Sequence, residues 1–156
     1  MRQATEHDLD FLADCYVKIA CHMKTGEQDF YIARLPEAPD ETIRTHIARY
    51  VGREDALTLL EEVEGTPIAC LLASIGGSSF AASPVGKSGH IAVCWVAPEN
   101  RRTGIAAKLV KAAEDWFRQK DVAVVELSYM VKNELAAVSW QQLGYQPFRV
   151  FAYKQL

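Results

Sequence analysis

Two arginines and a glycine stand where an apolar, strand-like run meets a helix-like run, in the stretch WVAPENRRTGIAAKLVKAAEDWF at residues 95–117. A helix that begins just after a strand leaves its first backbone N–H groups without partners, and its dipole adds about half a positive charge at that end. Arg101 and Arg102 add side chains that pair with phosphate oxygens, while Gly104 and Ala106 let the backbone come close to a ligand. The junction predicts a site for a diphosphate.

Two other phosphate-binding patterns do not fit this junction. No GK[ST] follows it, and the glycines of GxGxxG are absent. The formal net charge of −3 argues against a general nucleic-acid binder, because such proteins usually carry a net basic surface. We therefore expect a local anion site and no nucleic-acid partner.

Composition favours one globular domain over residues 1–156. Hydrophobic residues make up 49% of the chain and charged residues 24%, which is the balance of a soluble protein. No apolar stretch reaches the ~20 residues of a membrane span. The N-terminal MRQATEHDLD has no apolar core of the signal-peptide kind. We expect a cytoplasmic protein that does not enter a membrane.

The four cysteines, Cys15, Cys21, Cys70 and Cys94, lie far from any CxxC or Cys/His ligand spacing. This pattern predicts reduced, buried thiols, with neither a disulfide framework nor a metal site.

Hydrophobic spacing predicts the elements that position the junction. In the first half, MRQA is strand-like, and Thr5 and Asp8 form a capping pair before a helix that runs to about residue 22. Asp40 is the N-cap candidate of a second helix that ends at Gly52. A hairpin follows, formed by ALTLLEEVEG and TPIACLLASIGG around a Glu64-Gly65-Thr66 turn.

In the second half, HIAVCWVAP reads as a strand that is buried on both faces. The remaining segments are a helix over 103–120, a strand in DVAVVELSYMV, a helix capped by Asn133 and stopped by Gly144, and a final strand in YQPFRVFAYKQL. The order βααβββαβαβ predicts an α/β (α+β) fold with a mixed central sheet flanked by helices.

Three motifs in this order resemble the GNAT superfamily of acyl-CoA-dependent N-acetyltransferases. RRTGIA fits the signature [QR]-x-x-G-x-[GA], and VAPENR before it fits as well. MRQATEHDL resembles the first strand and helix of the family, and NELAAVSWQQLGYQPF is similar to its late motif N-x-x-A-x-x-x-Y-x-x-x-G-[FY]. The resemblance covers the whole chain and implies the GNAT-like fold, with a mostly antiparallel sheet.

The resemblance also implies acetyl-CoA, or coenzyme A, as cosubstrate, without a metal. The residues that would hold the pyrophosphate are Arg101, Arg102, Thr103, Gly104, Ile105 and Ala106. The main chain of Trp95 and Val96 would pair with the pantetheine arm, which Asn133 would also contact. Lys108, one turn into the helix, either approaches phosphate or lies on a solvated face.

Acetyl transfer to an amine requires a base, because an alkylamine is mostly protonated at neutral pH. His90 is the first candidate, since some protein-lysine acetyltransferases of the family have a carboxylate six residues before the valine that precedes the signature. His90 shares strand parity with Ala92, Cys94 and Val96, so we expect its side chain on the same face as theirs. An ordinary histidine at a strand edge is the alternative. Glu62 and Glu126 are the next candidates.

The late motif departs from the family at Trp140, which stands where most members have a tyrosine that protonates the leaving thiolate. An indole N–H is far too weak an acid for that task, and Trp140 is expected to pack in the core. Ser139, Tyr129 or Tyr145 could donate the proton instead. Coenzyme A is also a tolerable leaving group as a thiolate.

The resulting hypothesis is direct transfer of acetyl from acetyl-CoA to a primary amine in a ternary complex. The alternative is a non-catalytic acyl-CoA sensor or interaction domain, which Trp140 motivates. By resemblance, acceptor specificity resides in residues 22–39, 76–89 and 145–156. The acceptor stays open among polyamines, aminoglycosides, protein N-termini and lysines, with Glu27, Asp29 and Glu37 as groups that could attract a cation.

Only twelve residues follow Gly144, which leaves little room for the two strands that many members have there. An incomplete sheet edge invites pairing with a second chain, so we expect a homodimer.

Overall fold

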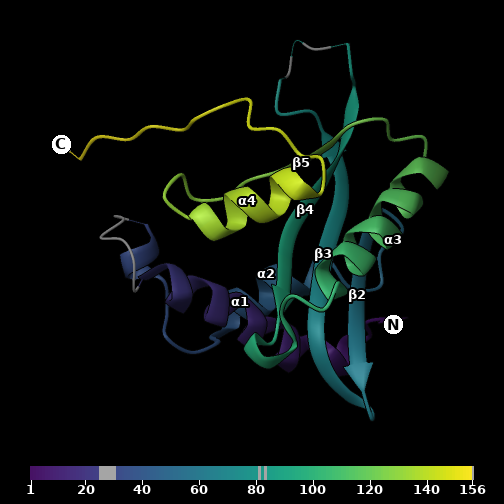
Figure 1. The fold of residues 1–156 in the computed structure, drawn as a ribbon, viewed down its shortest axis with the longest axis vertical. Helices are drawn as coiled ribbons and strands as arrows, with labels where there is room; N and C mark the ends of the chain where they lie inside the picture. Colours follow the sequence, from purple (N-terminus) through teal and green to yellow (C-terminus); the bar gives the residue numbers. More distant parts are fainter. Residues whose placement is uncertain (25–30, 81, 83, 156) are drawn as a thin grey trace.

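The computed structural model describes residues 1–24, 31–80, 82 and 84–155, and a single mixed sheet forms its centre. The sheet order is β1-β2-β3-β4-β5, with antiparallel pairs throughout except for the parallel pair β4 and β5 (Figure 1). The strands are β1 (Arg2–Gln3), β2 (Ala56–Val63), β3 (Thr66–Gly77), β4 (Lys87–Val96) and β5 (Val125–Leu127). The α-helices are α1 (Leu9–Lys24), α2 (Glu41–Ala48), α3 (Ile105–Gln119) and α4 (Glu134–Gln142). The predicted mixed α/β fold is confirmed.

Two hydrophobic cores fill the two faces of the sheet. On one face, α1 and α2 contribute Leu12 and Ile47 to a core that includes Leu72 and Trp95 from the sheet. On the other face, Leu109 and Phe117 of α3 pack on sheet residues such as Leu71, Ala73 and Ile91. Val125, Leu127, Trp140 and Leu143 lie at the margin of this second core, which holds β5 and α4 on the α3 side. Within the described residues, no helix has the length and apolar character needed to cross a membrane.

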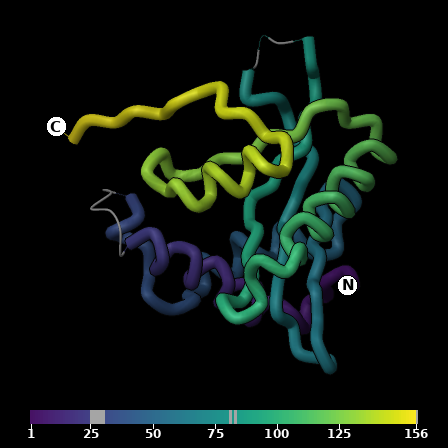
Figure 2. The backbone as a smooth tube through the Cα atoms, in the orientation of Figure 1, coloured from purple at the N-terminus to yellow at the C-terminus, as the bar shows by residue number. Residues whose placement is uncertain are grey.

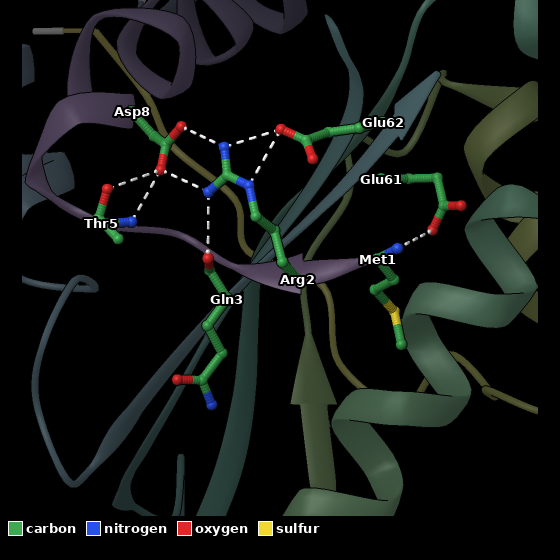
Figure 3. Close-up of polar contacts among 7 residues, drawn as sticks. All are labelled: Met1, Arg2, Gln3, Thr5, Asp8, Glu61 and Glu62. Carbon is green, nitrogen blue, oxygen red and sulfur yellow. Dashed lines mark hydrogen bonds and ion pairs between the residues drawn. The ribbon is translucent and has the colours of Figure 1, made fainter. Parts of the chain in front are cut away.

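A polar cluster fastens the N-terminal strand to its neighbours (Figure 3). The Arg2 guanidinium donates to both carboxylate oxygens of Asp8 at 2.8 Å and to Glu62 at 3.0 Å. The Asp8 carboxylate also accepts the backbone N–H of Thr5 at 2.8 Å, as the predicted capping pair requires. Glu62 of β2 therefore helps to hold β1 in place, on the side of β2 that faces away from β4.

The predicted N-caps of α2 and α4 and the glycine after α4 are confirmed, whereas α2 ends at Ala48 and not at Gly52 as predicted. Asp40 accepts the N–H of Ile43 at 2.9 Å, and Asn133 accepts the N–H of Ala136 at 3.0 Å. Gly144 follows α4 with a φ of 91°. In the β2–β3 turn, Glu64 and Gly65 both have positive φ angles, of 50° and 79°. This is the pattern of tight two-residue hairpin loops.

A β-bulge interrupts β4 at Ala92. Leu72 of β3 pairs with Val93, but the next residue, Ala73, pairs with Ile91, so Ala92 is an extra residue on β4. As a result, Ile91 belongs to the α3-side core whereas Val93 belongs to the α1-side core. Side chains after the bulge therefore face the opposite way from the one that simple alternation from Ile91 would give.

Strand β5 is much shorter than the predicted strand over residues 121–131. Its three residues pair with β4 only at Gly89↔Val125, His90↔Glu126 and Ile91↔Leu127. Past Leu127, the described chain leaves the edge of β4 and continues to α4. The two strands are therefore joined at the beginning of β4 and separate towards its end.

The predicted final strand is wrong over the residues that the structure describes. After Gly144 the chain has no strand pairing, and it runs past α4 and away from the sheet (Figure 1, Figure 2). Phe148, Val150 and Phe151 in this segment, which we call the C-terminal tail (residues 146–155), are 62%, 73% and 77% exposed. A strand needs a partner edge, and the tail leaves the sheet without pairing to one.

Candidate functional site

The turn before α3 presents the backbone groups that the sequence predicts. The first helical hydrogen bond runs from the N–H of Lys108 to the carbonyl of Gly104 at 3.0 Å, so the N–H groups of residues 104–107 have no partner one turn back. Arg102 and Gly104 have positive φ angles of 63° and 86°. A β-carbon at Gly104 would meet no atom within 4 Å, so the glycine is required by its backbone angle rather than by crowding. This turn and the first turn of α3, residues 101–106, form the α3 mouth.

Side chains tie the α3 mouth to the end of β4. The Nε of Arg101 donates to the carbonyl oxygen of Val96 at 3.0 Å, and Thr103 donates to the carbonyl oxygen of Asn100 at 2.6 Å. The terminal nitrogens of Arg101 are not part of its bond to Val96. Arg101, Arg102, Thr103 and Gly104 are all exposed. An anion can thus reach the backbone N–H groups and both guanidinium groups from solvent.

The edge of β4 beside the α3 mouth is open. Among the described residues, pairing of β4 with β5 ends at Ile91, so the edge from Ala92 to Val96 has no strand on that side. Trp95 holds this part of β4 in place, because its ring packs edge-on against Phe11 at 6.1 Å between centroids and is 8% exposed. Because the N–H of Ala97 donates to Ile68 of β3, the alternation of an antiparallel pair also turns the backbone groups of Trp95 towards β3. The open edge therefore offers the backbone of Val96, whose carbonyl oxygen already accepts from Arg101, rather than that of Trp95 as predicted.

Asn133 and Lys108, which the sequence also suggests for cofactor contacts, already have protein partners. The Oδ1 of Asn133 caps α4, which leaves its amide NH₂ group for another contact. The Nζ of Lys108 lies 2.7 and 2.8 Å from the two carboxylate oxygens of Glu61. Lys108 therefore points towards β2 and pairs with a carboxylate rather than projecting freely into solvent.

His90 lies on the opposite face from the one predicted. Gly89 and Ile91 face α3, so His90 between them faces the α1 side, whereas Cys94 and Val96 after the bulge lie against the α3-side core. The expectation that His90 shares a face with Cys94 and Val96 is therefore wrong, because the extra residue at Ala92 shifts the alternation.

His90 belongs to a polar group at the joined end of β4 and β5. Its Nε2 lies 3.0 Å from Oγ of Ser88 and 3.0 Å from the carbonyl oxygen of Gly77. Glu126 stands opposite His90 in the β4–β5 register. The Glu126 carboxylate accepts hydrogen bonds from the backbone N–H and the hydroxyl of Ser79.

Desolvation by burial acts to raise the pKa of Glu126, but hydrogen bonds from Ser79, the electrostatic interaction with His90 and a hydrogen bond from Ser88 outweigh it. The pKa of Glu126 is therefore lower than usual, and its carboxylate stays negative at neutral pH.

The acetyltransferase (GNAT) family model matches residues 22–145, which include both the α3 mouth and the His90 group. The chain belongs to the GNAT family. This match bears out the resemblance that the RRTGIA signature predicts.

Solved structures with the same fold include GNAT acetyltransferases. The aminoglycoside 6'-N-acetyltransferase AAC(6')-Ih from Acinetobacter baumannii is 22% identical, with a TM-score of 0.72 over 99% of this chain and 96% of that one. A GCN5-related N-acetyltransferase from Ralstonia eutropha is 19% identical, with a TM-score of 0.74 over 99% and 96%. AAC(6')-Iy in complex with the bisubstrate analog CoA-S-monomethyl-acetylneamine is 17% identical, with a TM-score of 0.72 over 99% and 96%.

In this GNAT protein two of the three hydroxyls predicted as acids, those of Ser139 and Tyr145, already donate to protein oxygens. Ser139 donates to the carbonyl of Leu135 at 2.7 Å, and Tyr145 donates to Glu114 of α3 at 3.1 Å. Burial and the nearby charge of Glu114 raise the pKa of Tyr145 above its ordinary value. The Trp140 ring packs edge-on against that of Tyr145 at 5.3 Å and borders the α3-side core, as expected of a packing residue.

The cysteines are free thiols in this GNAT protein, and Cys15 and Cys70 are buried. Burial raises the pKa of Cys94 to about 12, so its thiol stays protonated and is a poor nucleophile at neutral pH. Among the described residues, no three His, Cys, Asp or Glu side chains gather as a metal site would require.

Contacts of the C-terminal tail connect the three segments that the family resemblance assigns to acceptor binding. Arg149 donates to the carbonyl oxygen of Ser79 at 3.1 Å, and the rings of Phe148 and Phe80 lie 6.2 Å apart. Tyr153 meets Tyr31 edge-on at 5.6 Å. Glu27 and Asp29 lie outside the described residues, and Glu37 lies 4.0 Å from Lys24.

Sequence reasoning missed three partners of the His90 group, namely Ser88, Gly77 and Ser79. A small residue two positions before His90 on the same strand was a usable signal for Ser88. Gly77 and Ser79 carry no such signal, because their positions depend on the register between β3 and β4.

Proposed function

We propose that this GNAT protein transfers the acetyl group of acetyl-CoA to a primary amine, by direct attack in a ternary complex, within a single domain of residues 1–156. The observation that carries the proposal is the α3 mouth beside the open edge of β4. A diphosphate at the mouth and a pantetheine arm along that edge would follow one continuous path. Because pairing with β5 ends at Ile91, the edge of β4 from Ala92 to Val96 is unpaired on the side where that arm would lie.

Each part of coenzyme A has a proposed partner in this arrangement. The N–H groups of Gly104, Ile105 and Ala106, with Arg101, Arg102 and Thr103, bind the pyrophosphate. The backbone of Val96 pairs with an amide of pantetheine, and the amide NH₂ of Asn133 adds a further donor. A thioester placed along this edge can meet a backbone N–H of β4, which stabilises the oxyanion.

The proposed base is His90, because an imidazole nitrogen can accept a proton from an amine. It faces the α1 side of the sheet at the joined end of β4 and β5, next to the loop that holds Ser79. This is the end of the sheet that the C-terminal tail also contacts, through Arg149 and Ser79. An acceptor amine that enters beside the tail would reach His90 before it reaches the α3 mouth.

A dedicated acid for the leaving thiolate is less well supported than the base. Ser139 and Tyr145 stay candidates from the sequence, although each hydroxyl already donates to a protein oxygen. A thiol has an ordinary pKa of about 8.5, so coenzyme A can leave as a thiolate and be protonated afterwards. We expect Tyr145→Phe and Ser139→Ala to retain most of the turnover rate.

A non-catalytic acyl-CoA sensor is the second candidate, since Trp140 replaces the usual acid. Thiol release from acetyl-CoA, followed over a panel of polyamines, aminoglycosides, lysine peptides and peptides with free N-termini, separates the two. Amine-dependent release supports the transferase. Binding of acetyl-CoA without release by any amine supports the sensor.

We further propose that the chain forms a homodimer through the C-terminal tail. Phe148, Val150 and Phe151 are mostly exposed, and surfaces of this kind commonly mark contacts between proteins. Sedimentation of the full chain and of a Phe151→Ser variant tests this proposal. We expect a dimer that the variant weakens, and a monomeric wild type at all concentrations would contradict it.

A further inference from the structure

We propose that Ser88 and the carbonyl group of Gly77 hold His90 in one tautomer, with its proton on Nε2, so that Nδ1 is the atom that accepts a proton from the acceptor amine. The role of Nδ1 as the base rests on the proposed function. The tautomer itself does not, and it can be measured without substrate. Ser88 is then a positioning residue, which acts on the reaction only through His90.

The contacts of Nε2 carry the first step of the argument. Nε2 lies 3.0 Å from the Gly77 carbonyl oxygen and 3.0 Å from Oγ of Ser88, which itself lies 3.4 Å from the same carbonyl oxygen. Ser88 is fully buried, so its hydroxyl must find its partners within this group rather than in bulk water. These three polar atoms thus lie within 3.4 Å of one another on the α1 side of the sheet.

The chemistry of the two oxygens decides where the proton lies. A carbonyl oxygen can only accept a hydrogen bond, so a lone pair on Nε2 would face a second lone pair at 3.0 Å. A proton on Nε2 satisfies the Gly77 carbonyl and leaves the Ser88 hydroxyl free to donate onward. A neutral imidazole has only one N–H, so Nδ1 carries the lone pair.

Gly76 explains the orientation of the ring. A β-carbon at Gly76 would lie 3.3 Å from both Nε2 and Cδ2 of His90, so this edge of the imidazole packs against the bare backbone of β3. Nδ1 is the ring atom opposite the Nε2–Cδ2 bond. The basic nitrogen is therefore turned away from β3, where a side chain at residue 76 would otherwise crowd the ring.

Glu126 stabilises the ring once it is protonated. It faces His90 from β5, and the Ser88 hydroxyl hydrogen-bonds its carboxylate. In the proposed step, the amine enters neutral, having lost its ammonium proton to water. Its nitrogen bonds to the acetyl carbon and gives one proton to Nδ1, while the carbon–sulfur bond breaks and its electron pair stays on sulfur. The imidazolium then has both N–H groups, with Nε2–H bound as before, and releases the Nδ1 proton to water.

The direct test is the tautomer of His90 in the full chain. Long-range ¹H–¹⁵N NMR of uniformly ¹⁵N-labelled protein, at a pH where imidazole is neutral, distinguishes a protonated ring nitrogen from an unprotonated one. A His90→Gln variant identifies its signals among those of the four histidines. We expect one tautomer, with the proton on Nε2. A proton on Nδ1, or an averaged mixture of both tautomers, would overturn the proposal.

Kinetics with matched serine variants test the positioning role. Ser88→Ala should lower kcat by about tenfold or more while leaving KM for acetyl-CoA within about twofold, and Ser88→Thr, which keeps a hydroxyl, should recover most of the loss. Ser74→Ala makes the same change directly opposite His90 on β3, without a hydrogen bond to its ring among the described contacts, and should keep kcat.

If Ser88→Ala has the same kcat as the wild type, Ser88 does not position His90 for catalysis. If Ser88→Ala does not fold, the wild-type NMR measurement still decides the tautomer. If no amine is acetylated by the wild type, the proposed function fails while the tautomer result stands by itself.

Discussion

The ring of Phe117 on α3 packs directly on Gly89 of β4, where an added β-carbon would lie only 2.5 Å from Cε1 of the ring. This contact fixes the face of the strand: Gly89 and Ile91 face α3, and His90 between them faces the other way. The same contact also lets α3 lie close to the sheet, which sets where its N-terminal mouth meets the end of β4. One glycine therefore helps to place both parts of the candidate site.

Replacing that glycine should destabilise the fold. Gly89→Ala forces either the buried Phe117 ring or the strand to move, and overpacking of this kind typically costs about 1–3 kcal/mol. Chemical denaturation measures the change in the free energy of unfolding. Gly77→Ala is the matched control, because a β-carbon there meets nothing within 4 Å and its φ is not positive. Equal stability of the two variants would contradict the packing account.

Asp8 should stabilise the protein in a pH-dependent way. The Arg2 guanidinium has the largest effect on the pKa of Asp8 and holds it well below its ordinary value, in spite of desolvation by burial. Hydrogen bonds from Thr5 lower the pKa further. A carboxylate with a lowered folded-state pKa stabilises the fold above its unfolded pKa of about 3.9, and the effect is lost as the pH falls from there towards the folded-state pKa.

We therefore expect Asp8→Ala to cost on the order of 1 kcal/mol or more at pH 7, with the difference from wild type shrinking progressively below about pH 4. Urea denaturation across this pH range provides the measurement. Asp14→Ala, which removes the exposed partner of Lys18, is the control and should change stability little at any pH. A pH-independent loss in Asp8→Ala would show that its charge is not what matters.

Cys94 should not carry an acetyl group during turnover. Its pKa of about 12 leaves almost no thiolate at neutral pH, and direct transfer needs none. Cys94→Ala should keep amine-dependent release of coenzyme A within a few-fold of wild type. Intact-protein mass spectrometry of the enzyme mixed with acetyl-CoA alone should find no acetylated cysteine. Accumulation of an acetyl-enzyme that an amine then discharges would replace the ternary complex with a two-step mechanism.

Arg101 and Arg102 should recognise the diphosphate rather than the acyl end. Replacing both with alanine should weaken binding of coenzyme A by tenfold or more, since hydrogen bonds to charged groups contribute about 1.5–3 kcal/mol each. Binding of acetyl-pantetheine, which lacks the diphosphate, should change much less. Replacing both Lys111 and Arg118 with alanine, which removes two cations paired with Asp115 further along α3, is the charge-matched control. Equal losses for both ligands would remove the arginines from the phosphate site.

Local signals explain what the sequence could predict. Thr5, Asp40, Asn133 and Gly144 act on backbone groups within four residues, so their roles follow from the sequence alone. The α3 mouth was equally predictable, because a helix start, two arginines and a glycine all lie within one turn.

Features that depend on pairing between distant segments could not be predicted. The bulge at Ala92 depends on how β4 aligns with β3, and it moved His90 to the other face. The tail has the residues of a strand, but a strand also needs a partner edge. Strand register likewise determines the contacts among Ser88, Gly77 and His90. The hydrophobic periodicity of a single strand carries no information about that register.

The central claim is that the α3 mouth and the open edge of β4 bind acetyl-CoA. Isothermal titration calorimetry of acetyl-CoA into the purified full chain tests it most directly. We predict saturable binding of one acetyl-CoA per chain, with affinity that falls as salt is raised because charged groups hold the diphosphate. Titrations that release no heat of binding at any temperature tried, up to protein and ligand concentrations near the solubility limit, would contradict the account.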